Sequence, residues 1–139
     1  MKLSSKSRYG TRLMLDLAKH YGGEFIQLKE IAGRQGISLK YLEQIMISLK
    51  KAKYVKGVRG AKGGYKLSKA PGKITVGEIV AVLESGSPMT ECSENPEVCE
   101  RSESCPTRVL WKEAADALFE RLNTVTLADL LKGFDIGQG

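Results

Sequence analysis

The chain has 139 residues, of which 42% are hydrophobic and 27% charged, with a formal net charge of +6. This composition is typical of a globular protein. The first residues hold no apolar run for a signal peptide and no stretch could span a membrane, so we expect a cytoplasmic protein without membrane contact.

The charge is distributed unevenly along the chain. Residues 1–84 carry 17 Lys and Arg against 6 Asp and Glu, a net of +11, whereas residues 85–139 carry 5 against 10, a net of −5. No basic amphipathic helix with aromatic anchors is present, which disfavours a membrane surface as the partner. The basic N-terminal part therefore favours nucleic acid.

The first predicted helix spans about residues 7–21, and Gly22 and Gly23 end it. An apolar stripe with helical spacing runs along it. The only histidine, His20, falls in its last turn, where the helix dipole favours a cation. We therefore expect His20 to be structural rather than a ligand or a base.

Residues 27–67 form the stretch around which the chain is organised. A helix is predicted over residues 28–35, and Gly36 then stands where a helix end turns left-handed. Ser38 can cap a second helix that runs from about Leu39 to about Ala52. The short connection has the length used in helix-turn-helix pairs.

The second helix of this pair has two different faces. Its apolar face holds Leu39, Leu42, Ile45, Met46 and Leu49, and its polar face holds Lys40, Tyr41, Gln44, Ser48 and Lys51. Ordinary solvent exposure is the alternative interpretation of a polar face. However, basic and amide side chains near a helix N-terminus, here Lys40, Glu43 and Gln44, are those that read base edges in the major groove.

A basic hairpin follows over residues 54–67, with Arg59 and Lys62 near its glycine-rich tip. Glycine lets a backbone approach a phosphate closely, and arginine is favoured in a narrow minor groove. A nucleotide-phosphate loop is the rival interpretation, but the Walker pattern is incomplete and no helix follows at once. We interpret the hairpin as the wing of a winged helix-turn-helix.

The rest of the chain is predicted to be helical apart from one loop. Thr75 and Glu78 form a capping box for a short buried helix, and residues 89–104 show no periodicity. A long helix follows from Pro106 to about Asn123, and a last short helix ends at Gly133. The fold class is thus mainly α with a small β-hairpin wing.

The long helix carries an apolar stripe of Val109, Leu110, Ala114, Ala117, Leu118 and Leu122. The small N-terminal core leaves it no evident partner, so we expect a homodimer whose two-fold symmetry matches a palindromic operator on double-stranded DNA. Folding back onto its own domain is the alternative. The predicted organisation is a DNA-binding domain over 1–84, a cysteine-containing loop over 85–105, and a dimerisation helix with a short helix over 106–139.

All three cysteines, Cys92, Cys99 and Cys105, lie within fourteen residues. Their thiolates could converge on one metal centre, and cytosolic thiolate sites select zinc, copper(I) or iron–sulfur clusters. The spacing matches neither a zinc knuckle nor a ferredoxin. Glutamates at every third position from 91 to 103 disfavour a free reactive thiolate unless a cation neutralises them. Unligated or oxidising thiols remain the alternative.

Over nearly its whole length, the chain resembles the Rrf-two family of bacterial regulators, and most closely its three-cysteine, IscR-like members. The resemblance is carried by residues 2–10, 37–44, 58–60, 63–65 and 126–130, together with the cysteines. It implies a homodimeric winged-helix transcription regulator, usually a repressor. In IscR-like members the cysteine loop holds an iron–sulfur cluster, and the dimer forms through the long helix after it.

The resemblance also implies roles for individual residues. Lys40, Tyr41, Glu43 and Gln44 become major-groove residues and Arg59 a minor-groove residue, and we add Ser38 and Lys62 to this DNA-binding set. Cys92, Cys99 and Cys105 become ligands of a two-iron two-sulfur or four-iron four-sulfur cluster. The regulator would then sense iron or cluster status, oxygen or nitric oxide.

Three arginines depart from the family pattern of cluster ligands. Arg108 stands where IscR-like proteins have a histidine, and Arg8 and Arg12 stand where related proteins have an acidic ligand and a histidine. The fourth ligand is therefore unidentified; Glu103, a serine hydroxyl, a small thiol or water could fill the position.

The wing departs from the family pattern as well. It has Ala61-Lys62 where IscR-like proteins have Pro-Gly, and Ala61 resembles the cluster-free regulators of cysteine metabolism. A cluster-free or thiol-redox regulator of the same fold is thus an alternative. An iron–sulfur electron-transfer or carrier protein is an alternative from another class. An enzyme is disfavoured, because a single histidine at a helix end supplies no nucleophile–base pair.

Overall fold

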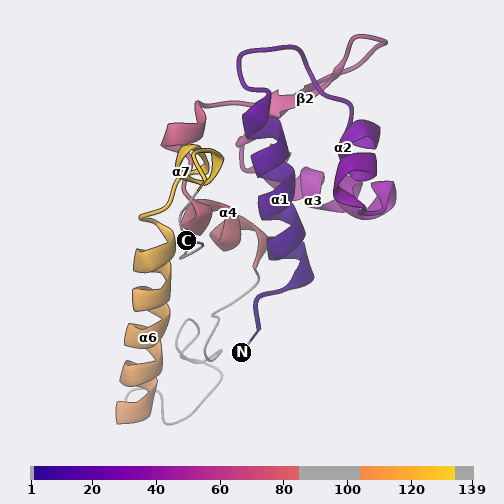
Figure 1. Ribbon diagram of the computed structural model, residues 1–139. Coiled ribbons are helices and arrows are strands. Elements are labelled where there is room, and N and C mark those ends of the chain that lie inside the picture. The colour runs from indigo at the N-terminus through magenta and orange to yellow at the C-terminus, as the bar shows by residue number, and fades with distance from the viewer. Residues whose placement is uncertain (1, 85–103, 134–139) are drawn as a thin grey trace.

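The computed structural model describes residues 2–84 and 104–133. Figure 1 shows a mainly helical chain with one two-stranded antiparallel hairpin, which is the expected fold class. The elements are α1 (Ser5–Lys19), α2 (Leu28–Gln35), α3 (Leu39–Lys51), β1 (Val55–Val58), β2 (Gly64–Leu67), the 3₁₀ turn η1 (Pro71–Lys73), α4 (Val76–Leu83), α6 (Pro106–Leu122) and α7 (Leu127–Leu131).

Helix α1 lies at the centre of the fold (Figure 1), in contact with α2, α3, α4, α7 and β2. It begins two residues before the predicted start, because the Ser4 side chain accepts a hydrogen bond from the backbone N–H of Ser7 and caps it. It also ends earlier, at Lys19, with His20 as the C-terminal cap.

The helix-turn-helix forms as its sequence predicts. Helix α2 has the predicted bounds, and Gly36 ends it in the left-handed region with φ 64°. Ser38 caps α3, since its Oγ accepts a hydrogen bond from the Tyr41 backbone N–H at 3.1 Å. Leu39 was expected on the apolar face, but as the first residue of α3 it stays 39% exposed, so the buried face begins at Leu42.

The core brings together side chains from both ends of the chain. Its largest fully buried members are Leu13, Met14, Leu17, Ile31, Leu42, Ile45, Leu49, Leu67, Ile74, Ile79 and Leu127. Leu127 belongs to α7, which packs against α1. The backbone N–H of Leu127 also donates to the carbonyl oxygen of Ile74 at 3.0 Å. The C-terminal short helix is therefore part of the same core as the helix-turn-helix.

A buried carboxylate fixes α1 against the end of α2. Asp16, whose side chain is 3% exposed, accepts two hydrogen bonds from the Arg34 guanidinium, at 2.7 and 3.1 Å, and one from the Gln35 side-chain amide at 3.0 Å. Burial alone would raise the pKa of Asp16, but the hydrogen bonds from Arg34 and Gln35 outweigh it and lower that pKa below its ordinary value. The carboxylate stays ionised and holds the two helices in register.

The wing is held to the segment that precedes α2. Strands β1 and β2 pair with Val55 opposite Leu67 and Val58 opposite Gly64. Beyond them, the Tyr65 backbone N–H donates to the Ile26 carbonyl oxygen at 2.7 Å, and the Ile26 N–H donates back at 2.9 Å. Gly64 has φ 139°, and a Cβ there would overlap the Ile26 carbonyl. This glycine is therefore required by packing within the protein.

Helix α6 extends away from the body of the molecule, and the chain then returns through α7 to α1 (Figure 1). Both predicted capping boxes form, at Thr75 with Glu78 and at Thr126 with Asp129. Pro106 occupies the first turn of α6, as predicted. No helix in the described ranges has the length and apolarity needed to cross a membrane.

Candidate nucleic-acid interface and cysteine site

Helix α3 presents a polar face on the side opposite its buried residues. Lys40, Glu43 and Gln44 are exposed there, within the first two turns of the helix. Ser38 is exposed as well, and its hydroxyl keeps its own hydrogen available because it caps α3 as an acceptor. The predicted base-reading side chains thus point away from the core, as contact with a duplex requires.

Tyr41 is the exception among the predicted DNA-binding residues, because it is half-buried against α1. Its ring meets Tyr9 edge-on with centroids 5.8 Å apart, and its hydroxyl lies 2.8 Å from Ser5 Oγ. Two turns further along α3, Ser48 accepts a hydrogen bond from Lys6 Nζ at 3.1 Å. Sequence reasoning missed these contacts, which place the first turn of α1 beside the polar face of α3.

The tip of the wing carries the predicted cations. Arg59 and Lys62 are both exposed there, between the ends of β1 and β2. The turn is closed by the Gly63 backbone N–H, which donates to the Gly60 carbonyl oxygen at 3.0 Å. The Gln27 side-chain amide donates to the Ala61 carbonyl oxygen at 3.4 Å. The wing tip is therefore positioned relative to the start of α2.

The charges on α3 and the wing are not neutralised by neighbours. The exposed cations are Lys40, Lys50, Lys51, Lys53, Lys56, Arg59 and Lys62. In the part of the chain that the structure describes, ion pairs join only other residues, in α1, α2 and α6. This surface keeps its positive charge, which attracts a polyanion and makes binding depend on salt.

One residue of the polar face of α3 was not assigned by sequence reasoning. Ile47 is 68% exposed, more than any other large hydrophobic residue that the structure describes. It lies three residues after Gln44 and four before Lys51, so a helical projection of the sequence could have placed it on this face.

Of the three predicted cluster ligands, the structure describes only Cys105; Cys92 and Cys99 lie outside the described residues. Cys105 is the N-terminal cap residue of α6, is half-buried, and has its Sγ 3.0 Å from Thr107 Oγ1. A helix N-terminus favours a negatively charged group, so this position suits a thiolate ligand. Within residues 2–84 and 104–133, no three His, Cys, Asp or Glu side chains gather as a metal site.

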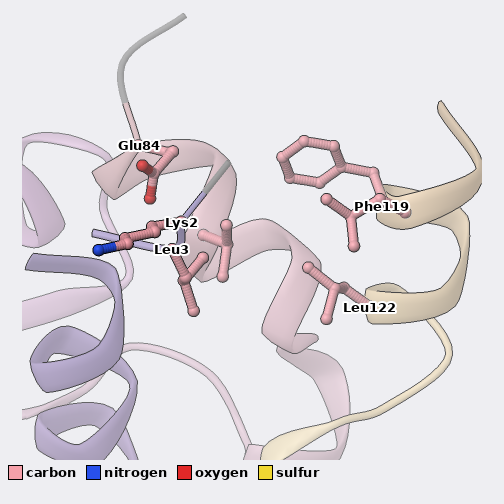
Figure 2. A pocket seen from close by; sticks show the side chains of 7 residues that line it. Lys2, Leu3, Glu84, Phe119 and Leu122 are labelled. Atoms are coloured by element: carbon pink, nitrogen blue, oxygen red, sulfur yellow. The ribbon is translucent and has the colours of Figure 1, made fainter. Parts of the chain in front are cut away.

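The C-terminal half of α6 packs against α4, and a cavity of about 230 Å³ remains between them. It is lined by Lys2, Leu3, Val80, Glu84, Leu118, Phe119 and Leu122. Figure 2 shows Phe119 and Leu122 projecting from α6 toward α4 and Leu3. The Glu84 carboxylate accepts a hydrogen bond from Ser4 Oγ at 3.0 Å, which ties the end of α4 to the cap of α1.

Within residues 2–84 and 104–133, nothing comparable covers the N-terminal half of α6. Ala115 is the only buried residue of the whole helix, whereas Val109, Leu110 and Trp111 in the N-terminal half are 54%, 53% and 36% exposed. The predicted stripe is therefore divided between two surfaces. Leu122 packs within the chain, and Leu110 with its neighbours faces outward.

A helix-turn-helix whose second helix exposes basic and amide side chains, followed by a basic β-hairpin, defines a winged helix-turn-helix DNA-binding protein. Residues 3–133 match the model of the Rrf2 family, described as an iron-dependent transcriptional regulator. The chain belongs to this family.

Two kinds of relatives support the assignment. The protein rrf2 of Nitratidesulfovibrio vulgaris is 47% identical over 132 residues, which cover 95% of this chain and 88% of that protein. The structure of IscR from T. potens is 40% identical, covers 100% of this chain and 92% of its own, and has a TM-score of 0.77.

The structure of CymR, the global cysteine regulator of B. subtilis, is equally similar. It is also 40% identical, covers 97% of this chain and 99% of its own, and has a TM-score of 0.76. The family is thus one of transcriptional regulators rather than enzymes, and both an IscR and a CymR lie at the same distance from this chain.

Proposed function

We propose that this chain is a homodimeric, sequence-specific repressor that binds a palindromic operator. Lys40, Glu43 and Gln44 of α3 would read base edges in the major groove, while Arg59 of the wing enters the minor groove. The observation that carries the proposal is the exposed polar face of α3, set beside a wing whose cations have no ion-pair partner in the described part of the chain.

Ser38, Tyr41 and Lys62 have more limited roles in this proposal. The Ser38 hydroxyl and the Lys62 ammonium group would contact phosphates, because both are exposed at the edges of the reading surface. Tyr41, whose hydroxyl is already beside Ser5 Oγ, would chiefly set the position of α3 while presenting the edge of its ring to the duplex.

Dimerisation through α6 is the second part of the proposal. Leu110, Ala114 and Ala117 recur at helical spacing on the uncovered side of the helix. Two alanines in such a row allow a second helix to approach closely. A second copy of this chain would cover them, and the two α3 helices would then face successive turns of a duplex.

The third part of the proposal is that Cys92, Cys99 and Cys105 hold an iron–sulfur cluster, which supplies sensitivity to iron, oxygen or nitric oxide. The similarity to an IscR supports this, as does the position of Cys105 at the helix N-terminus. Because Cys105 is the cap residue before α6 and α6 packs on α4, a change of ligation at this thiol would shift the spacing of the two DNA-binding units.

A cluster-free regulator of the same fold is the second candidate. The equal similarity to CymR favours it, together with Ala61 in the wing. In that case Cys105 and its companions would respond as thiols, or not at all. The DNA-binding surface would be unchanged, so the two candidates differ only at the cysteines.

The deciding experiment combines anaerobic purification with selection of DNA from a random pool. We expect a coloured protein with bound iron and sulfide, a palindromic selected sequence, and loss of colour in Cys105→Ala. A colourless protein that resists reconstitution yet selects the same operator would establish the cluster-free candidate. A coloured protein that retains no DNA sequence would instead indicate an electron-transfer or carrier protein.

Two variants separate base reading from phosphate binding. Gln44→Ala should cost roughly 1–3 kcal/mol on the selected operator and relax the preference at one base pair. Lys62→Ala should weaken binding to all sequences alike and reduce the slope of log affinity against log salt. Equal losses for Gln44→Ala on the operator and on random DNA would contradict base reading.

A further inference from the structure

Ile47 is an apolar side chain in the middle of a charged surface. At about 100° per residue it projects in nearly the same direction as Lys40, Gln44 and Lys51, away from the buried side of α3. It is 68% exposed, and nothing else in the described fold covers it. Isolated exposed hydrophobic residues are common on protein surfaces, so its position decides whether it has a function.

That position is the centre of the surface that meets DNA in the proposed function, on which this inference rests. Ile47 lies one turn after Gln44, about 4.5 Å further along the helix axis. Base pairs are stacked about 3.4 Å apart. With α3 placed in the major groove as proposed, the side chain would meet the base pair next to the one that Gln44 reads, or the one after it.

Only one base offers an apolar group in the major groove. Adenine, guanine and cytosine present nitrogen and oxygen atoms or amino groups there, whereas thymine presents its C5-methyl group. Isoleucine has no donor or acceptor, so over any other base edge it would displace water from polar atoms without replacing their hydrogen bonds. Over thymine it buries methyl against methyl.

We propose that Ile47 is a specificity-determining residue that selects thymine, through its C5-methyl group, at one position of each operator half-site. The neighbouring side chains support this chemistry. Lys40 and Lys51 flank Ile47 on the same face and can reach phosphates on either side, which would hold the apolar side chain against the floor of the groove. Gln44 beside it would fix the register.

Deoxyuridine tests the proposal directly, because it differs from thymidine only by lacking the methyl group. Each thymine of the selected operator is replaced by deoxyuridine in turn, and the Kd is measured at constant salt. We expect the wild-type Kd to rise about fourfold at one thymine per half-site, the effect of one buried methyl group. Replacing both symmetric thymines in a palindrome should raise it about sixteenfold.

Three variants accompany the wild type. Ile47→Ser should bind the thymine and deoxyuridine operators with equal Kd, while Ile47→Val should keep most of the discrimination. Leu131→Ser is the matched control, because Leu131 is also an exposed hydrophobic residue, 38% exposed, but lies on α7 away from α3. Its discrimination should equal that of the wild type. Circular dichroism checks that each variant is folded.

The outcomes separate this inference from the function on which it rests. A wild-type Kd that is unchanged by deoxyuridine at every thymine would overturn it. So would an Ile47→Ser variant that still discriminates, or a selected operator without thymine opposite α3. Each of these results would leave the DNA-binding function intact. Failure of the wild type to select any sequence would instead remove the proposed function, and this inference with it.

Discussion

Helices α1 and α6 are similar in length but differ in how much of each is buried. Seven of the fifteen residues of α1 are buried, among them Leu13 and Leu17 at 0% and 1% exposure. In α6 only Ala115 of seventeen is buried, although the helix carries leucines, a valine and the only tryptophan. Helix α1 therefore buries its apolar side chains within the described chain, whereas α6 leaves most of its own exposed there.

Within the described residues, the surroundings of α1 are complete in one chain, whereas those of α6 are not. Helix α1 has neighbours on several sides, and its buried Asp16 is matched by Arg34 and Gln35. Among the described elements, α6 makes its main contacts with α4. Against the rest of the described chain, Leu110 and Ala117 are exposed and Ala114 is half-buried, all three on one side of the helix. We attribute them to the proposed contact with a second copy.

The largest expected effect comes from the same substitution placed on each helix. Leu13→Ala should lower the free energy of unfolding by about 2–5 kcal/mol, because it leaves a cavity in a fully packed site. Leu110→Ala in dilute, dissociated protein should change it by less than about 0.5 kcal/mol. Urea denaturation at low protein concentration measures both. Equal losses would show that α6 is as complete within the monomer as α1.

A charge introduced into the apolar stripe of α6 should weaken association of the two chains instead. Leu110→Lys should weaken the dimer by roughly 1.5–3 kcal/mol, since a buried leucine is lost and an ammonium group is desolvated. Val109→Lys is the matched control: Val109 is equally exposed, 54% against 53%, but points about 100° away, on the side of Asp116.

Sedimentation equilibrium measures both variants. Only Leu110→Lys should shift the protein toward monomer, and its affinity for a palindromic site should fall in parallel. Dissociation by Val109→Lys alone would place the interface on the other side of α6 and would contradict the proposed packing.

The next largest effect concerns the buried carboxylate of α1. Asp16→Asn should destabilise the fold by about 1–2 kcal/mol, because it weakens the hydrogen bonds to Arg34 and Gln35, and the partial exposure of Arg34 limits the loss. The lowered native pKa of Asp16 means that the unfolded state binds its proton first as the pH falls.

The contribution of Asp16 is therefore complete above its ordinary pKa, about 4, and is lost as the pH falls from there toward the lower native value. Stability measured as a function of pH should show a shallower acid limb in Asp16→Asn than in the wild type. Parallel acid limbs would mean that other carboxyl groups account for acid denaturation.

Local signals in the sequence predicted most of the complete region. Gly36, Ser38 and the two threonine capping boxes act within four residues, so their roles follow from the sequence alone. The bounds of α2 and the hairpin were obtained in this way. Helical periodicity located the polar face of α3, the resemblance to the family supported its role, and Lys40, Glu43 and Gln44 are exposed there as expected.

Contacts between distant segments could not be predicted in the same way. Arg34, which donates to Asp16, lies eighteen residues away in the sequence. Ser4 and Glu84, which also form a hydrogen bond, are eighty residues apart. Nothing in a helical period distinguishes the half-buried Tyr41 from its exposed neighbours, because Tyr9 and Ser5 on another helix cover it. The predicted roles of Cys92 and Cys99 concern residues outside those described, and they stay predictions.

The smallest expected effect comes from the capping box of α7, the helix through which the chain returns to the core around α1 after α6. Thr126 Oγ accepts a hydrogen bond from the Asp129 backbone N–H at 3.1 Å, and the Asp129 carboxylate accepts one from the Thr126 N–H at 2.9 Å. Thr126→Ala removes the first of these and should cost about 0.5–2 kcal/mol. Thr75→Ala, in the equivalent box of α4, is the matched control.

Leu127, next to Thr126, is fully buried in the core beside α1, so α7 should unfold in the same transition as α1. Both threonine variants should then lower one common transition, seen identically by circular dichroism and by fluorescence of Trp111. If Thr126→Ala produced a separate early unfolding transition and Thr75→Ala did not, α7 would form a cooperative unit with α6. The border between the self-contained region and the dimerisation region would then lie before Thr126.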